Sequence, residues 1–106
     1  MTGKEYQDLA MRTSNRALEQ RQHLMNGVMG LNGEAGEVID IVKKFEFQGH
    51  DLNKEKLIDE CSDVCWYLAE IAESIGTTVD QFFYHNIEKL RKRYPEGFDS
   101  ERSINR

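Results

Sequence analysis

Acidic side chains recur at helical spacing in two separate segments of the chain. Three of these acids lie in the first segment and two in the second: Glu34, Glu37, Asp40, Glu60 and Asp63. Residues three or four apart share one face of an α-helix, so each set would form an acidic ridge. Carboxylate oxygens are the ligands that hard cations such as Mg²⁺ and Mn²⁺ prefer. The chemistry that this pattern suggests is therefore divalent-cation binding.

The two ridges are expected to meet across a helical hairpin, because only a short connection around residues 48–53 separates the two segments. With the turn centred near residue 50, the pairs equidistant from it are Glu37 with Asp63, Asp40 with Glu60, and Glu34 with Trp66. Like charges about 5 Å apart repel by roughly 3 kcal/mol at an effective dielectric constant of about 20. Exposure to water, protonation of some carboxylates or a bound cation would each relieve this repulsion.

Two other interpretations of the acids stay open. Both ridges would be solvated helix faces if they pointed away from each other, but their register and their apolar neighbours favour a shared site. A di-iron bundle uses Glu-x-x-His motifs, whereas Glu37 follows Glu34 and Asp63 follows Glu60 at that spacing. The three histidines lie elsewhere, at His23, His50 and His85, where surface or packing roles are expected. All-oxygen ligation therefore favours Mg²⁺ over iron.

A basic stripe near the C-terminus offers a counterpart to the acids. Asn86, Lys89 and Arg93 share one helix face, where the two cations suit phosphate oxygens and the amide suits a polar edge. Lys43 continues the first acidic ridge, and Trp66 lies beside Asp63, where an indole would stack on a base. The alternatives are a solvated, ion-paired helix face for the cations and a core position for the tryptophan.

Apolar spacing of three and four residues predicts the helices that must position these side chains. We expect an all-α, four-helix protomer with a central antiparallel hairpin, its helices covering about residues 3–24, 26–47, 53–76 and 78–94. Thr2, Asn53 and Thr78 are expected N-caps, and Gly49 and Gly76 are expected left-handed ends. Pro95 cannot continue the last helix, so residues 95–106 form a tail.

Four glycines fall three residues apart in the second predicted helix: Gly27, Gly30, Gly33 and Gly36. Each costs about 1 kcal/mol relative to alanine inside a helix. Either the helix begins later, near Leu31, or another helix or a ligand approaches this surface closely.

Length and composition set the broad class of the protein. The 106 residues fit one domain, and 39% apolar residues give a lean core, which favours assembly into a helical-bundle oligomer. A net charge of −5 lacks the electrostatic footprint of a nucleic-acid binder, and no apolar run is long enough for a membrane span. Cys61 and Cys65 are interpreted as two buried thiols in a reducing, cytoplasmic setting.

Three of these segments together resemble a known family. "GEAGE" at 33–37, "ECSD" at 60–63 and "NIEKLRKRYPEGF" at 86–98 resemble the motifs of the all-α nucleoside triphosphate pyrophosphohydrolases, the MazG-like group. The likeness covers residues 30–106 and, more faintly, the opening "YQDLAMRT". One departure is Gly33, where many relatives carry a second consecutive acid.

The resemblance implies an enzyme that hydrolyses nucleoside triphosphates to monophosphate and pyrophosphate in nucleotide-pool cleaning, as a homodimer or homotetramer with shared active sites. It implies Mg²⁺, or Mn²⁺, held by Glu34, Glu37, Glu60 and Asp63, with Glu37 and Glu34 as catalytic residues. Substrate contacts would come from Asn86, Lys89, Arg93 and Tyr94, beside Lys43 and Trp66. Narrower alternatives are a dUTPase or dCTPase type and a phosphoribosyl-ATP pyrophosphatase. A non-catalytic helical interaction module is the alternative from another class.

Overall fold

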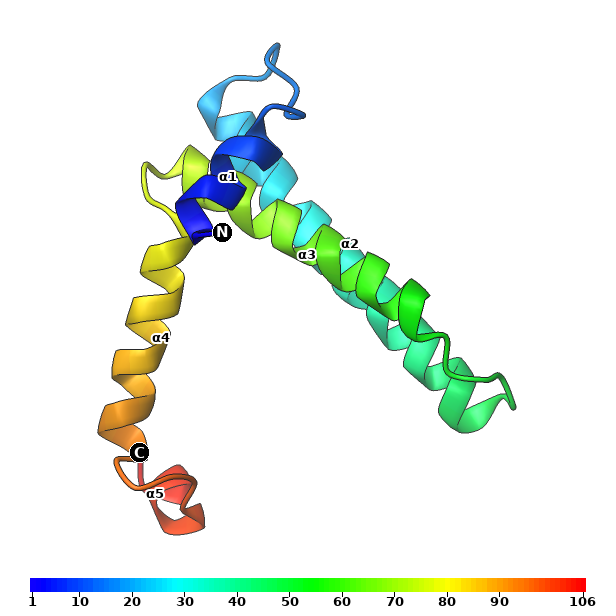
Figure 1. The fold of residues 1–106 in the computed structure, drawn as a ribbon, viewed down its shortest axis with the longest axis vertical. Helices are drawn as coiled ribbons and strands as arrows, with labels where there is room; N and C mark the ends of the chain where they lie inside the picture. The colour runs from blue at the N-terminus through cyan, green and yellow to red at the C-terminus, as the bar shows by residue number, and fades with distance from the viewer.

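The computed structural model describes residues 1–106 and is all-helical, as the sequence predicts. Its five helices are α1 (Gly3–Met11), α2 (Gln20–Phe47), α3 (Lys54–Ser74), α4 (Val79–Arg93) and α5 (Ser100–Ile104). The long helices α2 and α3 form the central antiparallel hairpin, and α1 lies against its open end (Figure 1). From that same end α4 diverges, so that the molecule has two arms. None of the helices is both long and apolar enough to cross a membrane.

Most of the predicted helix ends are confirmed. The Thr2 hydroxyl accepts a 3.0 Å hydrogen bond from the Glu5 backbone N–H, and the Asn53 side chain accepts one of the same length from Lys56. Gly49 and Gly76 have φ angles of 72° and 74°, which favour glycine because it has no Cβ. Thr78 precedes α4 as predicted, but its side chain makes no capping bond.

Two predicted boundaries are wrong. The first helix ends at Met11 rather than near residue 24, and α2 already begins at Gln20. Side chains between them bond to local backbone, since the Thr13 hydroxyl donates to the Ala10 carbonyl at 2.7 Å and the Asn15 side chain accepts from Ala17. Such bonds compete with the helical pattern. The tail also contains the short helix α5, which Asp99 caps by accepting from the Glu101 N–H.

Close approach of α3 explains two of the four helical glycines. A Cβ on Gly27 would lie 2.8 Å from Cγ1 of Ile71, and one on Gly30 would overlap the ring of Tyr67. At Gly33 and Gly36, by contrast, no other side chain or distant backbone lies within 4 Å of the Cβ position. The alternative of a later helix start is wrong, because all four glycines lie inside α2.

A small core joins α1, the end of α3 and the start of α4. Its buried apolar residues are Ala10, Ala69, Ala72 and Val79, with Trp66 and Phe82 packed against them. Buried Gln7 completes this junction, since its amide donates to Glu73 and to the Thr77 carbonyl while its oxygen accepts from the Val79 N–H at 2.9 Å. One polar side chain thereby fixes where α4 leaves the hairpin.

The protomer leaves large apolar surfaces uncovered. Its radius of gyration is 16.8 Å, whereas a compact domain of this length would have about 13 Å. Only 10 of the 106 residues are buried, and large exposed apolar side chains include Met29, Ile39, Val42 and Phe45 on α2, Ile58 on α3, and Phe83, Ile87 and Leu90 on α4. Cys61 and Cys65 are exposed as well, so the expectation of buried thiols is wrong for the protomer.

Alanine substitutions at two neighbouring glycines should have opposite effects on stability. Gly30→Ala should lower the free energy of unfolding by about 1–3 kcal/mol, because its methyl group overlaps the Tyr67 ring. Gly33→Ala should raise it by about 0.5–1 kcal/mol, because its methyl group meets open space and alanine favours the helix. Urea denaturation measures both values, and equal effects of the two substitutions would contradict this packing.

Candidate functional site

Three carboxylates converge where α2 packs against α3. One oxygen each from Glu34, Glu60 and Asp63 can be chosen so that all three lie within 4.8 Å of one another. All three side chains are half-buried, whereas their neighbour Glu37 is exposed. The helical seam, rather than a loop, holds these oxygens close together, so the cluster is built on rigid elements.

The proximity of these acids changes the protonation chemistry of Glu34. Its pKa is raised above the ordinary value chiefly by a side-chain hydrogen bond with Glu60. Partial burial and the negative charges of Asp63, Glu60 and Glu37 raise it further. None of the three clustered acids forms an ion pair with a lysine, arginine or histidine of the protomer. The cluster therefore carries negative charge that the chain itself does not neutralise.

The hairpin register differs from the predicted one. Glu34 meets Glu60 and Asp63 rather than Trp66, which shifts the pairing by about one helical turn. Asp40 is not part of the cluster. Its carboxylate pairs with Lys44 at 2.8 Å, and its pKa is lowered by that bond and by the charges of Lys44, Lys43 and Lys56. The first ridge is thus divided into an acidic half and an ion-paired half.

The donor set of the cluster fits a hard divalent cation. Such cations take oxygen ligands and need several negative charges nearby. Glu34, Glu60 and Asp63 supply three convergent carboxylates with no histidine or cysteine among them. Glu37 lies on the same helix one turn further on and close enough for its charge to act on Glu34. Its place as a fourth ligand remains a prediction.

The predicted substrate-contacting residues do not gather at the acids within one protomer. Asn86, Lys89, Arg93 and Tyr94 belong to α4 and its C-terminal end, on the arm that diverges from the hairpin (Figure 1). Lys43 is exposed on α2. The Trp66 indole N–H donates to the Thr13 hydroxyl at 2.8 Å and to the Ala10 carbonyl at 3.2 Å, so its ring packs under the end of α1.

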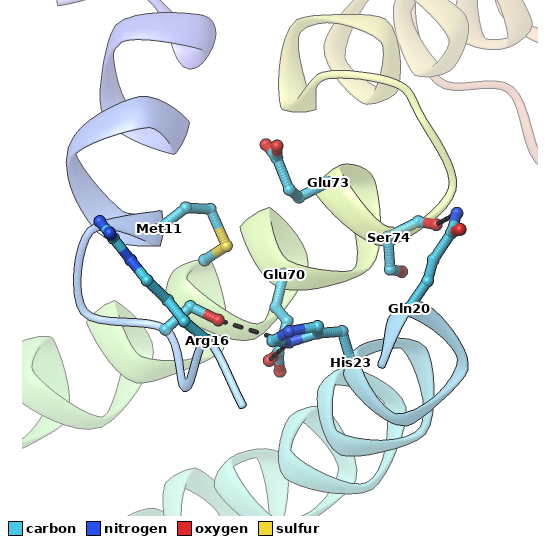
Figure 2. A pocket seen from close by; sticks show the side chains of 8 residues that line it. Met11, Arg16, Gln20, His23, Glu70, Glu73 and Ser74 are labelled. Carbon is cyan, nitrogen blue, oxygen red and sulfur yellow. Dashed lines mark hydrogen bonds and ion pairs between the residues drawn. The ribbon is translucent and has the colours of Figure 1, made fainter. Parts of the chain in front are cut away.

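Sequence reasoning missed a second polar group on the same seam. Glu70 is 1% exposed, and its two oxygens contact Nδ1 of His23 at 3.0 Å and the side-chain amide of Asn26 at 2.8 Å. Figure 2 shows Glu70 and His23 in a pocket between α1, α2 and α3. The sequence spacing could have pointed to this residue, because Glu70 follows Asp63 by seven residues and so faces the same way on α3.

Comparisons with known proteins found a matching family model and a related phage protein. The family model described as the MazG nucleotide pyrophosphohydrolase domain matches residues 22–98, which include both acidic motifs and α4. The chain is also 34% identical over 73 residues to the Gene 37 protein of Mycobacterium phage L5. That alignment covers 65% of this chain and 64% of the phage protein, which is less than two thirds of its length. No solved structure matches the chain.

Removing one clustered charge should stabilise the protein in the absence of divalent cations. Glu60→Gln keeps the size of the side chain but relieves the repulsion with Glu34 and Asp63, so the melting temperature in EDTA should rise by a few degrees. The matched control is Asp59→Asn, an exposed neighbour on α3 outside the cluster, which should leave the melting temperature unchanged. A Glu60→Gln protein that melts lower in EDTA would contradict a repulsive cluster.

Proposed function

Because the chain belongs to the MazG nucleotide pyrophosphohydrolase domain family, we propose that it hydrolyses nucleoside triphosphates to nucleoside monophosphates and pyrophosphate. The observation that carries the proposal is the convergence of Glu34, Glu60 and Asp63 without a cationic partner. Such a cluster costs stability unless binding a cation repays it, and polyphosphates are substrates that reach enzymes with such cations.

Under this proposal, Glu34, Glu60 and Asp63 hold Mg²⁺ or Mn²⁺, with Glu37 as a further ligand or as the base. A bound cation of this kind neutralises phosphate charge and lowers the pKa of a bound water molecule. The chain's own contribution is to fix the ligands on two packed helices, so that little reorganisation is needed on binding.

Glu37 is the best candidate for the general base. It is exposed and lies outside the trio, so one of its oxygens is free to accept a proton from an attacking water molecule. Glu34 has a raised pKa and a hydrogen bond with Glu60, so it would have to lose its proton before it could act as a ligand. The water's proton would pass to Glu37 as the water oxygen bonds to phosphorus, and the bond from that phosphorus to the pyrophosphate oxygen would break as pyrophosphate leaves.

We also propose a homodimer or homotetramer in which active sites are shared. Asn86, Lys89 and Arg93 lie on the diverging arm, and their stripe flanks the uncovered apolar residues Phe83 and Ile87. A second copy that covered this apolar face would bring its negatively charged hairpin towards the cations. The uncovered apolar side chains of α2 are a matching surface on that hairpin.

Substitutions that preserve size at the acids should abolish turnover. Glu37→Gln and Asp63→Asn should each lower pyrophosphate release in the presence of Mg²⁺ by at least about a hundredfold, because one removes the base and the other a ligand. The control Asp59→Asn should retain full activity. Pyrophosphate is measured across the common ribo- and deoxyribonucleoside triphosphates, with helix content followed by circular dichroism.

Retained activity in both acid variants would contradict the site assignment. A wild-type protein that releases no pyrophosphate from any triphosphate, with or without Mg²⁺ or Mn²⁺, would instead support a non-catalytic interaction module. The same panel of triphosphates separates a general hydrolase from a dUTPase or dCTPase type.

Subunit mixing should restore activity if cations and acids come from different chains. Asp63→Asn lacks an acid, and the double variant Lys89→Ala/Arg93→Ala lacks the cations, so both should be inactive alone. Co-expressed with two affinity tags and purified as the mixed dimer, they should recover about half of wild-type activity, because one of the two sites in each mixed dimer is intact. No recovery in a purified mixed dimer would show that each site is complete within one chain.

A further inference from the structure

The pocket of Figure 2 is separate from the acidic cluster and has its own chemistry. It encloses about 340 Å³, within the range of small-molecule sites, and lies where the α1–α2 connection passes α3. Its lining contains one apolar side chain among polar ones: Met11, Ser14, Arg16, Gln20, His23, Glu70, Glu73 and Ser74. A polar lining of this kind suits a ligand with several hydrogen-bonding groups.

Hydrogen bonds within the protein hold the side chains at the floor of this pocket in place. Both carboxylate oxygens of buried Glu70 are used, one by His23 and one by Asn26, so Glu70 orients the imidazole instead of meeting a ligand. The Ser14 hydroxyl lies 3.4 Å from the same Nδ1 atom, which leaves Nε2 of His23 without a partner in the protein. Gln20 is fixed as well, since its amide donates to the Ser74 carbonyl.

The rim of the pocket offers one free donor group and one free acceptor. The Arg16 guanidinium makes no ion pair or side-chain hydrogen bond in the protomer. Glu73 uses Oε1 to accept from the Gln7 amide at 2.9 Å, which leaves Oε2 as an unused acceptor. Two carboxylates disfavour an inorganic anion here, and the arginine disfavours a simple cation. A neutral heterocycle that carries both a donor and an acceptor would use both groups.

The pocket also lies at a useful distance from the acids. Glu73 follows Asp63 by ten residues on α3, a rise of roughly 15 Å along the helix. The Tyr67 ring, packed on Gly30, lies on the seam between them. Because that packing closes the seam, a nucleotide whose phosphates reach the acidic cluster would pass its sugar over the surface of the hairpin, with its base towards the pocket.

We propose that this pocket binds the nucleobase of the substrate and favours bases with an exocyclic amino group, which donates to Glu73 while Arg16 donates to the adjacent ring acceptor. This inference rests on the proposed function for its link to triphosphates. The base-binding pocket itself has a test that needs no hydrolysis. Cytosine and uracil give the sharpest comparison, because they differ in an amino group and a carbonyl oxygen at one position.

Hydrolysis of CTP and UTP should show the preference and its cause. Wild type should favour CTP in kcat/KM, and Glu73→Gln should reduce the CTP-to-UTP ratio about tenfold. That substitution keeps an oxygen for Gln7 but replaces the free acceptor by a donor. Arg16→Gln should raise KM with little change in kcat. The controls are Arg12→Gln, on the same connection outside the pocket, and Glu55→Gln, exposed on α3. Equal losses on CTP and UTP in both lining variants would overturn the proposal.

Titration with CMP and UMP tests the pocket independently of catalysis. By calorimetry in EDTA, CMP should bind about tenfold more tightly than UMP, and Arg16→Gln should weaken CMP binding while Arg12→Gln does not. Equal affinities for CMP and UMP, or no binding of either, would overturn the base pocket. If no triphosphate is hydrolysed but CMP binds selectively, the proposed reaction fails and the base pocket stands.

Discussion

The central constraint in this structure is the repulsion between carboxylates that two packed helices hold close together. Glu34, Glu60 and Asp63 lie within 4.8 Å of one another, and their proximity raises the pKa of Glu34. Folding alone gains nothing from this arrangement, because like charges in a half-buried seam oppose the packing that brings them together. The glycines beneath Ile71 and Tyr67 hold the seam closed despite that cost, since they let the helices approach to backbone contact.

The same hairpin links the acids to the rest of the molecule. The seam runs from the acidic cluster past Tyr67 to the buried Glu70 and the pocket beside it. Beyond that pocket, Gln7 joins α1 to the start of α4 and so sets the direction of the second arm. Two observations support the proposed assembly of more than one chain: the apolar stripe on that arm is uncovered, and the predicted cations lie apart from the acids.

The fold class and most helix ends could be predicted from the sequence, because they depend on residue spacing and on capping residues close to each helix end. The 3.6-residue period gave the all-α class, and Asn53, Gly49 and Gly76 gave the ends of the hairpin helices. The register of α2 against α3 was predicted less accurately, since it depends on how Tyr67 packs over Gly30 and not on the centre of the turn. The break after Met11 was missed because two short polar side chains, Thr13 and Asn15, bond to local backbone there, with no proline or glycine to mark the helix end. The Glu70 site was missed because burial of a single carboxylate leaves no mark on composition.

Localising a bound cation tests the central claim most directly. Mn²⁺ broadens the NMR signals of nearby nuclei, so a titration of the ¹⁵N-labelled full chain maps where it binds. The account predicts that substoichiometric Mn²⁺ broadens first the amide signals around Glu34, Glu60 and Asp63, and that excess Mg²⁺ restores them. Broadening that begins elsewhere, for instance around Asp99 and Glu101, or that leaves the α2–α3 seam untouched, would contradict it.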